Sequence, residues 1–228
     1  MRFATKPSRR ETLWGGIYLL LYLTVLPLAI PLVAMLLFRT MDEAKINFIY
    51  LFINFAATTV IFRKYLLRSL ADGLRYPLAT LWYALLGTMG ALLLGEMTLS
   101  LILRLCPEFM NVNDAAISEA VAANPLLMFI GAVILAPVSE ELLFRGLIFR
   151  GLYDRSPLAA HGLTMVLFSL IHVSGYVVLY DTKILFFCFL QYLPVAYCLN
   201  FAYRYSGSIA APILIHMANN LLALSAMR

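Results

Sequence analysis

Two glutamates and one arginine interrupt an otherwise apolar segment, which reads APVSEELLFRG over residues 136–146. Glu141 and Arg145 are four residues apart, so on a helix they can form an ion pair along one face. Glu140 points about 100° away from Glu141 and cannot share that pair equally. We therefore expect Arg145 to neutralise Glu141 and to leave Glu140 free. A free, partly desolvated carboxylate is suited to act as a general base.

Two of the three histidines extend this set of polar residues. His172 ends an apolar segment, and His216 lies in the last apolar segment with Asn220 one helical turn later on the same face. A carboxylate, two imidazoles and a carboxamide around a wet pocket can activate water and stabilise an oxyanion. The set favours hydrolysis of an acyl bond without a protein nucleophile. Either histidine alone could instead be an interhelical hydrogen-bonding residue.

The elements that position these groups are membrane helices, as the composition indicates. The chain has 228 residues, of which 63% are hydrophobic and 13% charged, and its mean hydropathy is +0.87. This apolar content suffices for roughly seven spans of about 20 residues each. It excludes two-domain soluble enzymes, and three scattered cysteines make no disulfide scaffold. We expect an all-α, polytopic transmembrane helical bundle that forms a single integral membrane domain over residues 1–228.

Apolar runs and the polar breaks between them define the expected helices. The first run is longer than the 7–15 apolar residues of a signal peptide, so we interpret it as a retained span. The basic run at 63–76 places several leucines on one face, which suits a helix lying in the cytoplasmic interface. A solvated basic loop is an equal alternative. The predicted helices cover about 13–38, 46–62, 79–103, 126–149, 158–172, 184–203 and 208–226.

Basic loops alternate with neutral or acidic loops along the chain. The positive-inside rule predicts an integral, multi-pass protein with a cytoplasmic N-terminus and an outside C-terminus, against which only Arg228 counts. These loops also explain the net charge of +5, so we expect no nucleic-acid partner. At about 1.5 Å per residue, Glu140 and His216 come out about 10–12 Å from the cytoplasmic side, and His172 at about 20 Å. We expect the active site nearer the cytoplasmic side. The basic loops carry Arg2, Lys6, Arg9 and Arg10, then Arg63, Lys64, Arg68 and Arg75, then Arg150 and Arg155, and then Arg204.

Three short motifs occur in order: Glu-Glu-x-x-x-Arg at 140–145, Phe-x-x-x-His at 168–172 and His-x-x-x-Asn at 216–220. In this the chain resembles the CPBP family of intramembrane proteases (CAAX protease and bacteriocin-processing, also called Abi). The resemblance covers about residues 120–225, the expected catalytic core, whereas the first three spans carry no signature. It implies an endopeptidase related to the Ras-converting CAAX enzyme, which acts on a membrane-associated protein or peptide in the lipid bilayer.

The resemblance also implies roles for individual residues. Glu140 would activate water with the help of His172, while His216 and Asn220 would stabilise the tetrahedral oxyanion. Glu141 and Arg145 would orient these groups.

Family members have been described both as glutamate-dependent and as metal-dependent proteases. Glu140, His172 and His216 would make a reasonable three-ligand zinc site with water in the fourth position. The His-Glu-x-x-His motif of many zinc proteases is absent from the sequence, however. We therefore favour a reaction that requires no cofactor and keep a divalent metal such as zinc as the alternative.

Other functions account for fewer of these residues. A serine–histidine dyad built on Ser169 or Ser174 would lack a Gly-x-Ser-x-Gly elbow and leave the glutamates unexplained. Asp154 and Asp181 fall in loops, so an aspartyl pair is not expected. The main alternative is a proton- or ion-coupled transporter that uses the intramembrane glutamates, although the sequence shows no paired repeats. A catalytically silent membrane scaffold is the third possibility.

Overall fold

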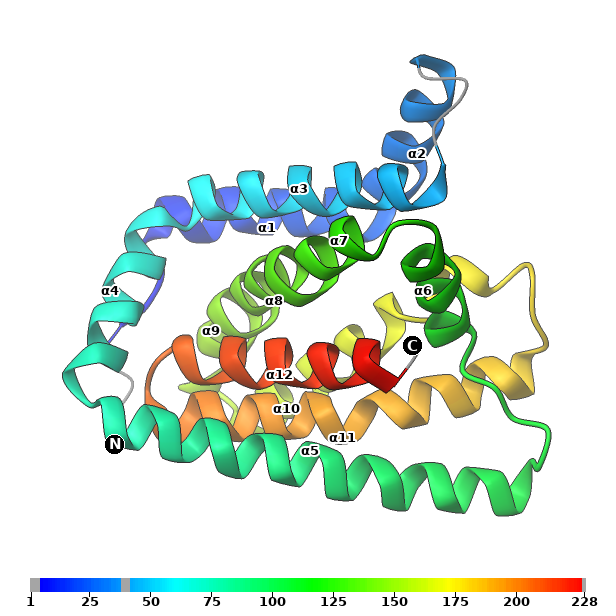
Figure 1. The fold of residues 1–228 in the computed structure, drawn as a ribbon. Coiled ribbons are helices and arrows are strands. Elements are labelled where there is room, and N and C mark those ends of the chain that lie inside the picture. The colour runs from blue at the N-terminus through cyan, green and yellow to red at the C-terminus, as the bar shows by residue number, and fades with distance from the viewer. Residues whose placement is uncertain (1–4, 38–41, 227–228) are drawn as a thin grey trace.

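The computed structural model describes residues 5–37 and 42–226, and every regular element within them is helical (Figure 1). This confirms the all-α helical bundle. Five helical stretches are long and apolar enough to cross a membrane, and six if the bent pair α1–α2 counts as one span. α12 is apolar but shorter, so the count of seven spans stays a prediction. The longer helices are α1 (Arg9–Thr24), α2 (Leu26–Leu37), α3 (Glu43–Ile61), α4 (Arg63–Arg75), α5 (Pro77–Leu105), α6 (Val112–Ala123), α10 (Pro157–Ile171), α11 (Thr182–Ser206) and α12 (Ala210–Ala226).

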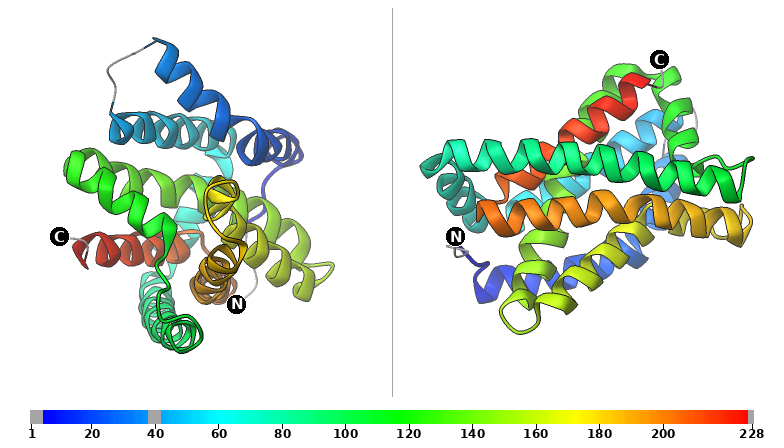
Figure 2. Two further views of the ribbon diagram at one scale, coloured as in Figure 1. Left: turned by 90° about the vertical axis from the view of Figure 1, so that its right-hand side faces the viewer. Right: turned by 90° about the horizontal axis from the view of Figure 1, so that it is seen from below.

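The first predicted span, 13–38, is not one straight helix. α1 and α2 meet at 64°, and α2 protrudes from the bundle beyond α1 and α3 (Figures 1 and 2). Pro27, in the first turn of α2, has no N–H to donate. In a straight helix its ring would clash with the carbonyl oxygen of Leu23, four residues earlier. The chain bends at this point. The end of the predicted span, Phe38, and the basic residues Arg2 and Arg228 lie outside the described residues.

The basic run 63–76 forms the helix α4, so the loop alternative is wrong. Its buried face repeats every four residues through Tyr65, Ser69 and Gly73. The hydroxyl of Ser69 accepts the Ile209 N–H at 2.9 Å, which attaches α4 to the start of α12. The leucines of α4 do not share one environment: Leu67 is 69% exposed, whereas others pack on the bundle core. A position in the membrane interface stays a prediction for α4.

The acidic break between the third and fourth predicted spans contains a further helix, α6. Asn111 caps its N-terminus because its side-chain oxygen accepts the N–H groups of Asn113 and Asp114 at 3.0 and 3.2 Å. The sequence reasoning missed α6 because its charged and polar residues were read only as a separator between spans. α6 lies at the end of the bundle opposite α4 (Figure 1).

The stretch Pro125–Tyr153 is the centre of the bundle. It is the most buried of the candidate spans, with 67% of its apolar window inside the protein. Wide π-type turns at Phe129–Leu135 and Leu142–Phe149 flank a short α-helical segment, α8 (Ala136–Glu141), which carries both glutamates. Such π-turns occur frequently at functional sites. α3 packs on one side of this stretch, and α12 packs on it while also contacting the antiparallel helices α5 and α11 (Figures 1 and 2).

Candidate active site

All four residues predicted to do chemistry line one cavity. Glu140 from α8, His172 at the end of α10, and His216 and Asn220 from α12 surround a space of about 420 Å³. The greater depth estimated for His172 therefore does not keep it from the others. The opposite wall comes from residues that precede the predicted catalytic core, and no sequence motif indicated it. That wall is formed by Tyr22, Leu23, Pro27 and Pro31 of α1–α2, Asn47, Tyr50 and Leu51 of α3, and Asn113, Ala116 and Ile117 of α6.

The expected ion pair between Glu141 and Arg145 is confirmed. Arg145 Nη1 lies 3.0 Å from Glu141 Oε1, and both side chains are completely buried. The other donors of the guanidinium bind α11, with Nε on the Asn200 side-chain oxygen and Nη2 on the Ala196 carbonyl, each at 3.1 Å. The guanidinium also stacks 4.7 Å from the ring centre of Phe168 on α10. Arg145 thus ties the central helix to two neighbouring helices.

Glu141 holds His216 as well as Arg145. Its Oε1 lies 2.9 Å from His216 Nδ1, and because a carboxylate accepts, Nδ1 carries the proton of this hydrogen bond. The other ring nitrogen, Nε2, faces Glu140, whose Oε2 is 3.9 Å away. The adjacent glutamates therefore sit on the two nitrogens of one imidazole. Glu141 fixes the ring, and Glu140 lies on its cavity side.

Glu140 has a carboxylate oxygen without a hydrogen-bond partner among the described residues. This oxygen, Oε2, is buried. A buried polar atom of this kind is normally satisfied by water or a bound group. Since the Glu140 side chain lines the cavity, its carboxylate is the natural binding point for a water molecule there.

The orientation of His172 is fixed by its own helix. His172 Nδ1 lies 2.7 Å from the carbonyl oxygen of Phe168. A carbonyl oxygen only accepts, so Nδ1 carries a proton and the neutral ring offers Nε2 as an acceptor. The Phe168 ring packs at centroid distances of 4.7 Å from His172 and 5.5 Å from His216. The phenylalanine of the second motif therefore spaces the two histidines.

Tyr192 of α11 is a site residue that the sequence reasoning missed. Its ring stacks on His172 with a centroid distance of 4.3 Å. Its hydroxyl donates to the Asp114 carboxylate at 3.2 Å and accepts from Asn113 Nδ2 at 3.0 Å, which links His172 to α6. Burial raises the pKa of Asp114, while the Tyr192 hydroxyl acts to lower it. One aromatic residue among many in an apolar segment gives no sequence signal for this contact.

Asn220 has a structural partner inside the site. Its Nδ2 donates to the Ala132 carbonyl at 2.8 Å. In the adjacent π-turn the N–H of Ala136 bonds the carbonyl five residues back, at Gly131. The next donor in this register would belong to residue 137, which is proline and has no N–H. Asn220 therefore satisfies a carbonyl that the helix leaves free, and it retains a second amide hydrogen.

The alternative chemistries find less support in the geometry. Among residues 5–37 and 42–226, no three His, Cys, Asp or Glu side chains are arranged to hold a metal ion. Glu140, His172 and His216 as they lie do not fit a zinc ligand set, and that set stays a prediction. Ser174 lines the cavity, but in the described part of the chain no hydrogen bond joins it to His172. Asp154 pairs with Arg150 at 3.0 Å and does not line this cavity.

Comparison with known proteins agrees with the three motifs. Residues 122–222 match the family model described as type II CAAX prenyl endopeptidase Rce1-like. The matched residues make up less than half of the chain, and over them the chain is similar to the Rce1-like family. The match confirms the resemblance to the CAAX protease group. The Rce1-like region contains Glu140, His172, His216 and Asn220, and it begins at residue 122, so the residues that form the opposite cavity wall lie outside it.

One curated relative is similar over about half of the chain. The protein named "Putative membrane peptidase YdiL" from Bacillus subtilis is 29% identical over 109 residues. The alignment covers 47% of this chain and 40% of that protein. No solved structure matches the chain. The Rce1-like region, the similarity to a membrane peptidase and the long apolar helices describe an integral membrane protein related to proteases.

Proposed function

We propose that this protein is an intramembrane endopeptidase that hydrolyses a peptide bond of a membrane-associated protein or peptide. The observation that carries the proposal is the convergence of Glu140, His172, His216 and Asn220 from three helices on one cavity. The Glu140 carboxylate and the His172 imidazole, whose Nε2 can accept a hydrogen bond, lie in the same cavity. This is the equipment needed to bind and deprotonate a water molecule.

In the proposed reaction, water attacks the carbonyl carbon of the scissile peptide bond. Glu140 takes one proton from this water, and His172 Nε2 accepts a hydrogen bond from the other. The carbon–nitrogen bond then breaks, and the proton held by Glu140 passes to the departing amine. The products are a carboxylic acid and an amine, so no covalent intermediate with the protein is required.

The developing oxyanion requires hydrogen-bond donors, which His216 and Asn220 supply in this proposal. Because Glu141 holds His216 Nδ1–H, the ring can donate through Nε2 only when it carries a second proton. The Glu141 carboxylate on one side of the ring and the developing oxyanion on the other then balance that positive charge. Asn220 donates through the amide hydrogen that Ala132 does not take. Glu141 and Arg145 orient these groups without touching the substrate.

We further propose processing of the CAAX type or of a related C-terminal or leader segment, without a metal cofactor. The Rce1-like region supports the substrate class at the level of the family. The positive-inside pattern supports a cytoplasmic N-terminus and an active site nearer the cytoplasmic side. We propose the metal-free mechanism because a glutamate and a neutral histidine that line one cavity can activate water without a metal.

The reaction class can be tested with purified protein in lipid nanodiscs and a farnesylated CAAX peptide, with the unprenylated peptide beside it. In water enriched in oxygen-18, hydrolysis puts one heavy oxygen atom into the new C-terminal carboxylate, which mass spectrometry detects. The transporter alternative would instead be supported if neither peptide is cleaved and the protein in proteoliposomes takes up a solute together with protons.

The metal question needs a separate measurement on the same preparation. We expect active protein with less than about one-tenth of an equivalent of zinc, and activity that survives prolonged treatment with a chelator. Activity that is lost to the chelator and restored by zinc, while the melting temperature stays unchanged, would reject the metal-free mechanism. Removal of a structural zinc would instead destabilise the fold.

A further inference from the structure

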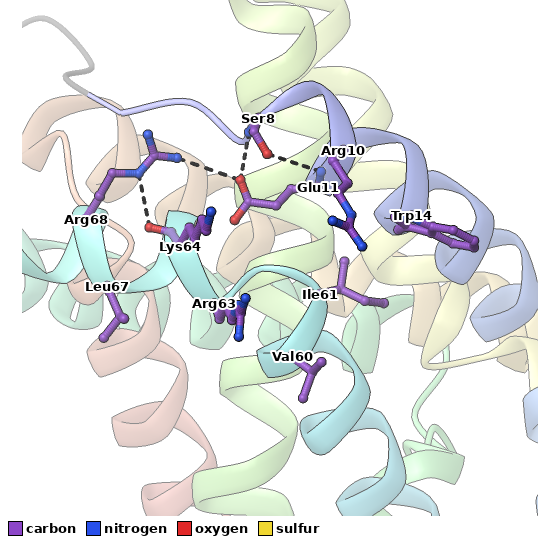
Figure 3. Close-up of a pocket in the computed structure, with 10 residues that line it drawn as sticks. All are labelled: Ser8, Arg10, Glu11, Trp14, Val60, Ile61, Arg63, Lys64, Leu67 and Arg68. Carbon is purple, nitrogen blue, oxygen red and sulfur yellow. Dashed lines mark hydrogen bonds and ion pairs between the residues drawn. The ribbon is translucent and has the colours of Figure 1, made fainter.

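A second and larger cavity lies at a corner of the bundle, away from the candidate active site. It has a volume of about 840 Å³ and forms where the N-terminal end of α1 meets the junction of α3 and α4 (Figure 3). Basic and apolar side chains line it together with a single acid. The lining residues are Ser8, Arg10, Glu11, Trp14, Val60, Ile61, Arg63, Lys64, Leu67 and Arg68. We call this the corner pocket.

Glu11 is the single acid of the corner pocket, and both of its carboxylate oxygens accept backbone N–H groups. One carboxylate oxygen accepts the Ser8 N–H at 2.8 Å, which completes a capping box at the start of α1. The other accepts the Tyr65 N–H at 2.7 Å, in the first turn of α4. The side chain is buried, and the nearest cation is Arg68 at 3.7 Å. Glu11 therefore caps two helices at once and fixes the angle between them.

The remaining cations of the corner pocket have no counter-charge. Arg10, Arg63 and Lys64 are exposed, and in the described part of the chain none of them makes an ion pair or a side-chain hydrogen bond. Figure 3 shows Arg10 on α1 facing the α3–α4 corner that carries the other two. The three unpaired cations repel one another, and an anion bound in the corner pocket would offset this repulsion. The charge of the pocket fits a phosphate group.

The apolar part of the corner pocket distinguishes between sources of phosphate. Trp14, Val60 and Leu67 are 52%, 71% and 69% exposed. Contact of this apolar surface with water is unfavourable, whereas contact with lipid acyl chains is favourable. A tryptophan beside clustered Arg and Lys is typical of the headgroup level of a bilayer. A small soluble phosphate would bind the cations but would make no favourable contact with the apolar side chains.

We infer that the corner pocket binds the phosphate headgroup of an anionic phospholipid, with Arg10, Arg63 and Lys64 around the phosphate and an acyl chain along Trp14, Val60 and Leu67. This binding site goes beyond the proposed peptidase activity and does not depend on it. It anchors the α1–α4 corner of the bundle to an anionic leaflet.

Trp14 provides the readout, because the chain contains only two tryptophans and Trp82→Phe leaves Trp14 alone. The Trp82→Phe protein is placed in phosphatidylcholine nanodiscs that contain a small fraction of phosphatidylglycerol brominated near the headgroup end of its acyl chains. We expect quenching of Trp14 well above that produced by the same fraction of brominated phosphatidylcholine. Quenching equal for the two lipids would overturn the inference.

Charge variants test which residues recruit the lipid. In the same background, Arg63→Gln/Lys64→Gln is expected to reduce the preference for phosphatidylglycerol about tenfold or more, as follows from two juxtamembrane cations. The matched control Arg9→Gln/Arg75→Gln removes the same charge from neighbouring positions outside the corner pocket and should leave the preference within about twofold. An equal loss in both variants would mean a diffuse surface effect and would reject the pocket.

Free phosphate distinguishes the two sources of the anion. Inorganic phosphate at 10 mM, about the upper end of a physiological concentration, should leave the quenching as it is in sodium chloride of equal ionic strength. Specific reversal by phosphate would assign the corner pocket to a soluble anion and reject the lipid. Because the variants lie outside the candidate active site, peptide cleavage measured on the same samples reports the proposed function independently.

Discussion

Arg145 is the residue whose replacement should destabilise the fold most clearly. It is completely buried, and its guanidinium serves the Glu141 carboxylate, the Asn200 side chain and the Ala196 carbonyl. Met fills a similar volume, so Arg145→Met removes these bonds with little loss of packing. Breaking a buried ion pair costs about 3–5 kcal/mol, because one charge is left buried without its partner. At about 2–4 °C per kcal/mol for a chain of this size, the melting temperature should fall by about 6–20 °C.

Thermal unfolding in detergent measures this change, and Arg155→Met serves as the matched control. Arg155 is exposed, so its replacement should alter melting by no more than about 1–2 °C. The double variant Glu141→Gln/Arg145→Met removes both charges and should lose less stability than the two single variants added together, by about 0.5–3 kcal/mol. Melting of Arg145→Met that matches Arg155→Met would show that the pair is not formed in the folded protein.

Three further predictions concern the site, the packing and the topology. Tyr192→Leu removes the ring stacked on His172 and should lower kcat, whereas Tyr192→Phe keeps the ring and should retain most activity. An equal loss of kcat in both variants would assign the loss to the hydroxyl group and its contact with α6. Gly146→Val should lower the melting temperature, because even a Cβ atom there would lie 2.8 Å from the Tyr65 ring, and overpacking costs about 1–3 kcal/mol; unchanged melting would show that the ring moves aside freely. Reporters inserted at residues 70 and 112, which lie beyond opposite ends of α5, should report cytoplasm and exterior, and the same compartment for both would reject the predicted topology.

The sequence was sufficient to predict the ion pair and four of the residues that line the cavity, which are Glu140, His172, His216 and Asn220. Charged and polar side chains are expensive in apolar segments, so each one marks a position that the fold must satisfy. Spacing within one helix then paired Glu141 with Arg145, as the structure confirms. Spacing could not reveal that Glu141 also holds His216, because that contact joins α8 to α12 and depends on how the two helices pack.

The fold was less predictable where polar sequence forms helices and where apolar sequence bends. α6 is polar enough to resemble a loop, yet the Asn111 cap and packing against the bundle make it helical. The bend between α1 and α2 follows from Pro27, which apolar periodicity does not detect. Tyr22 of α1 and Tyr50 of α3 line the cavity, and Tyr192 stacks on His172, all from outside the motifs, so only the tertiary structure reveals them.

Glu140→Gln tests most directly the claim that Glu140 activates water. The substitution keeps the size of the side chain and removes the base, and losing a general base typically lowers the rate by about 10²–10⁴-fold. With the farnesylated CAAX peptide in nanodiscs, we expect cleavage to fall by at least this factor while melting and peptide binding stay close to those of the parent. Glu96→Gln, which neutralises an exposed glutamate on α5, should cleave at the parental rate. Cleavage by Glu140→Gln at the parental rate would contradict the account.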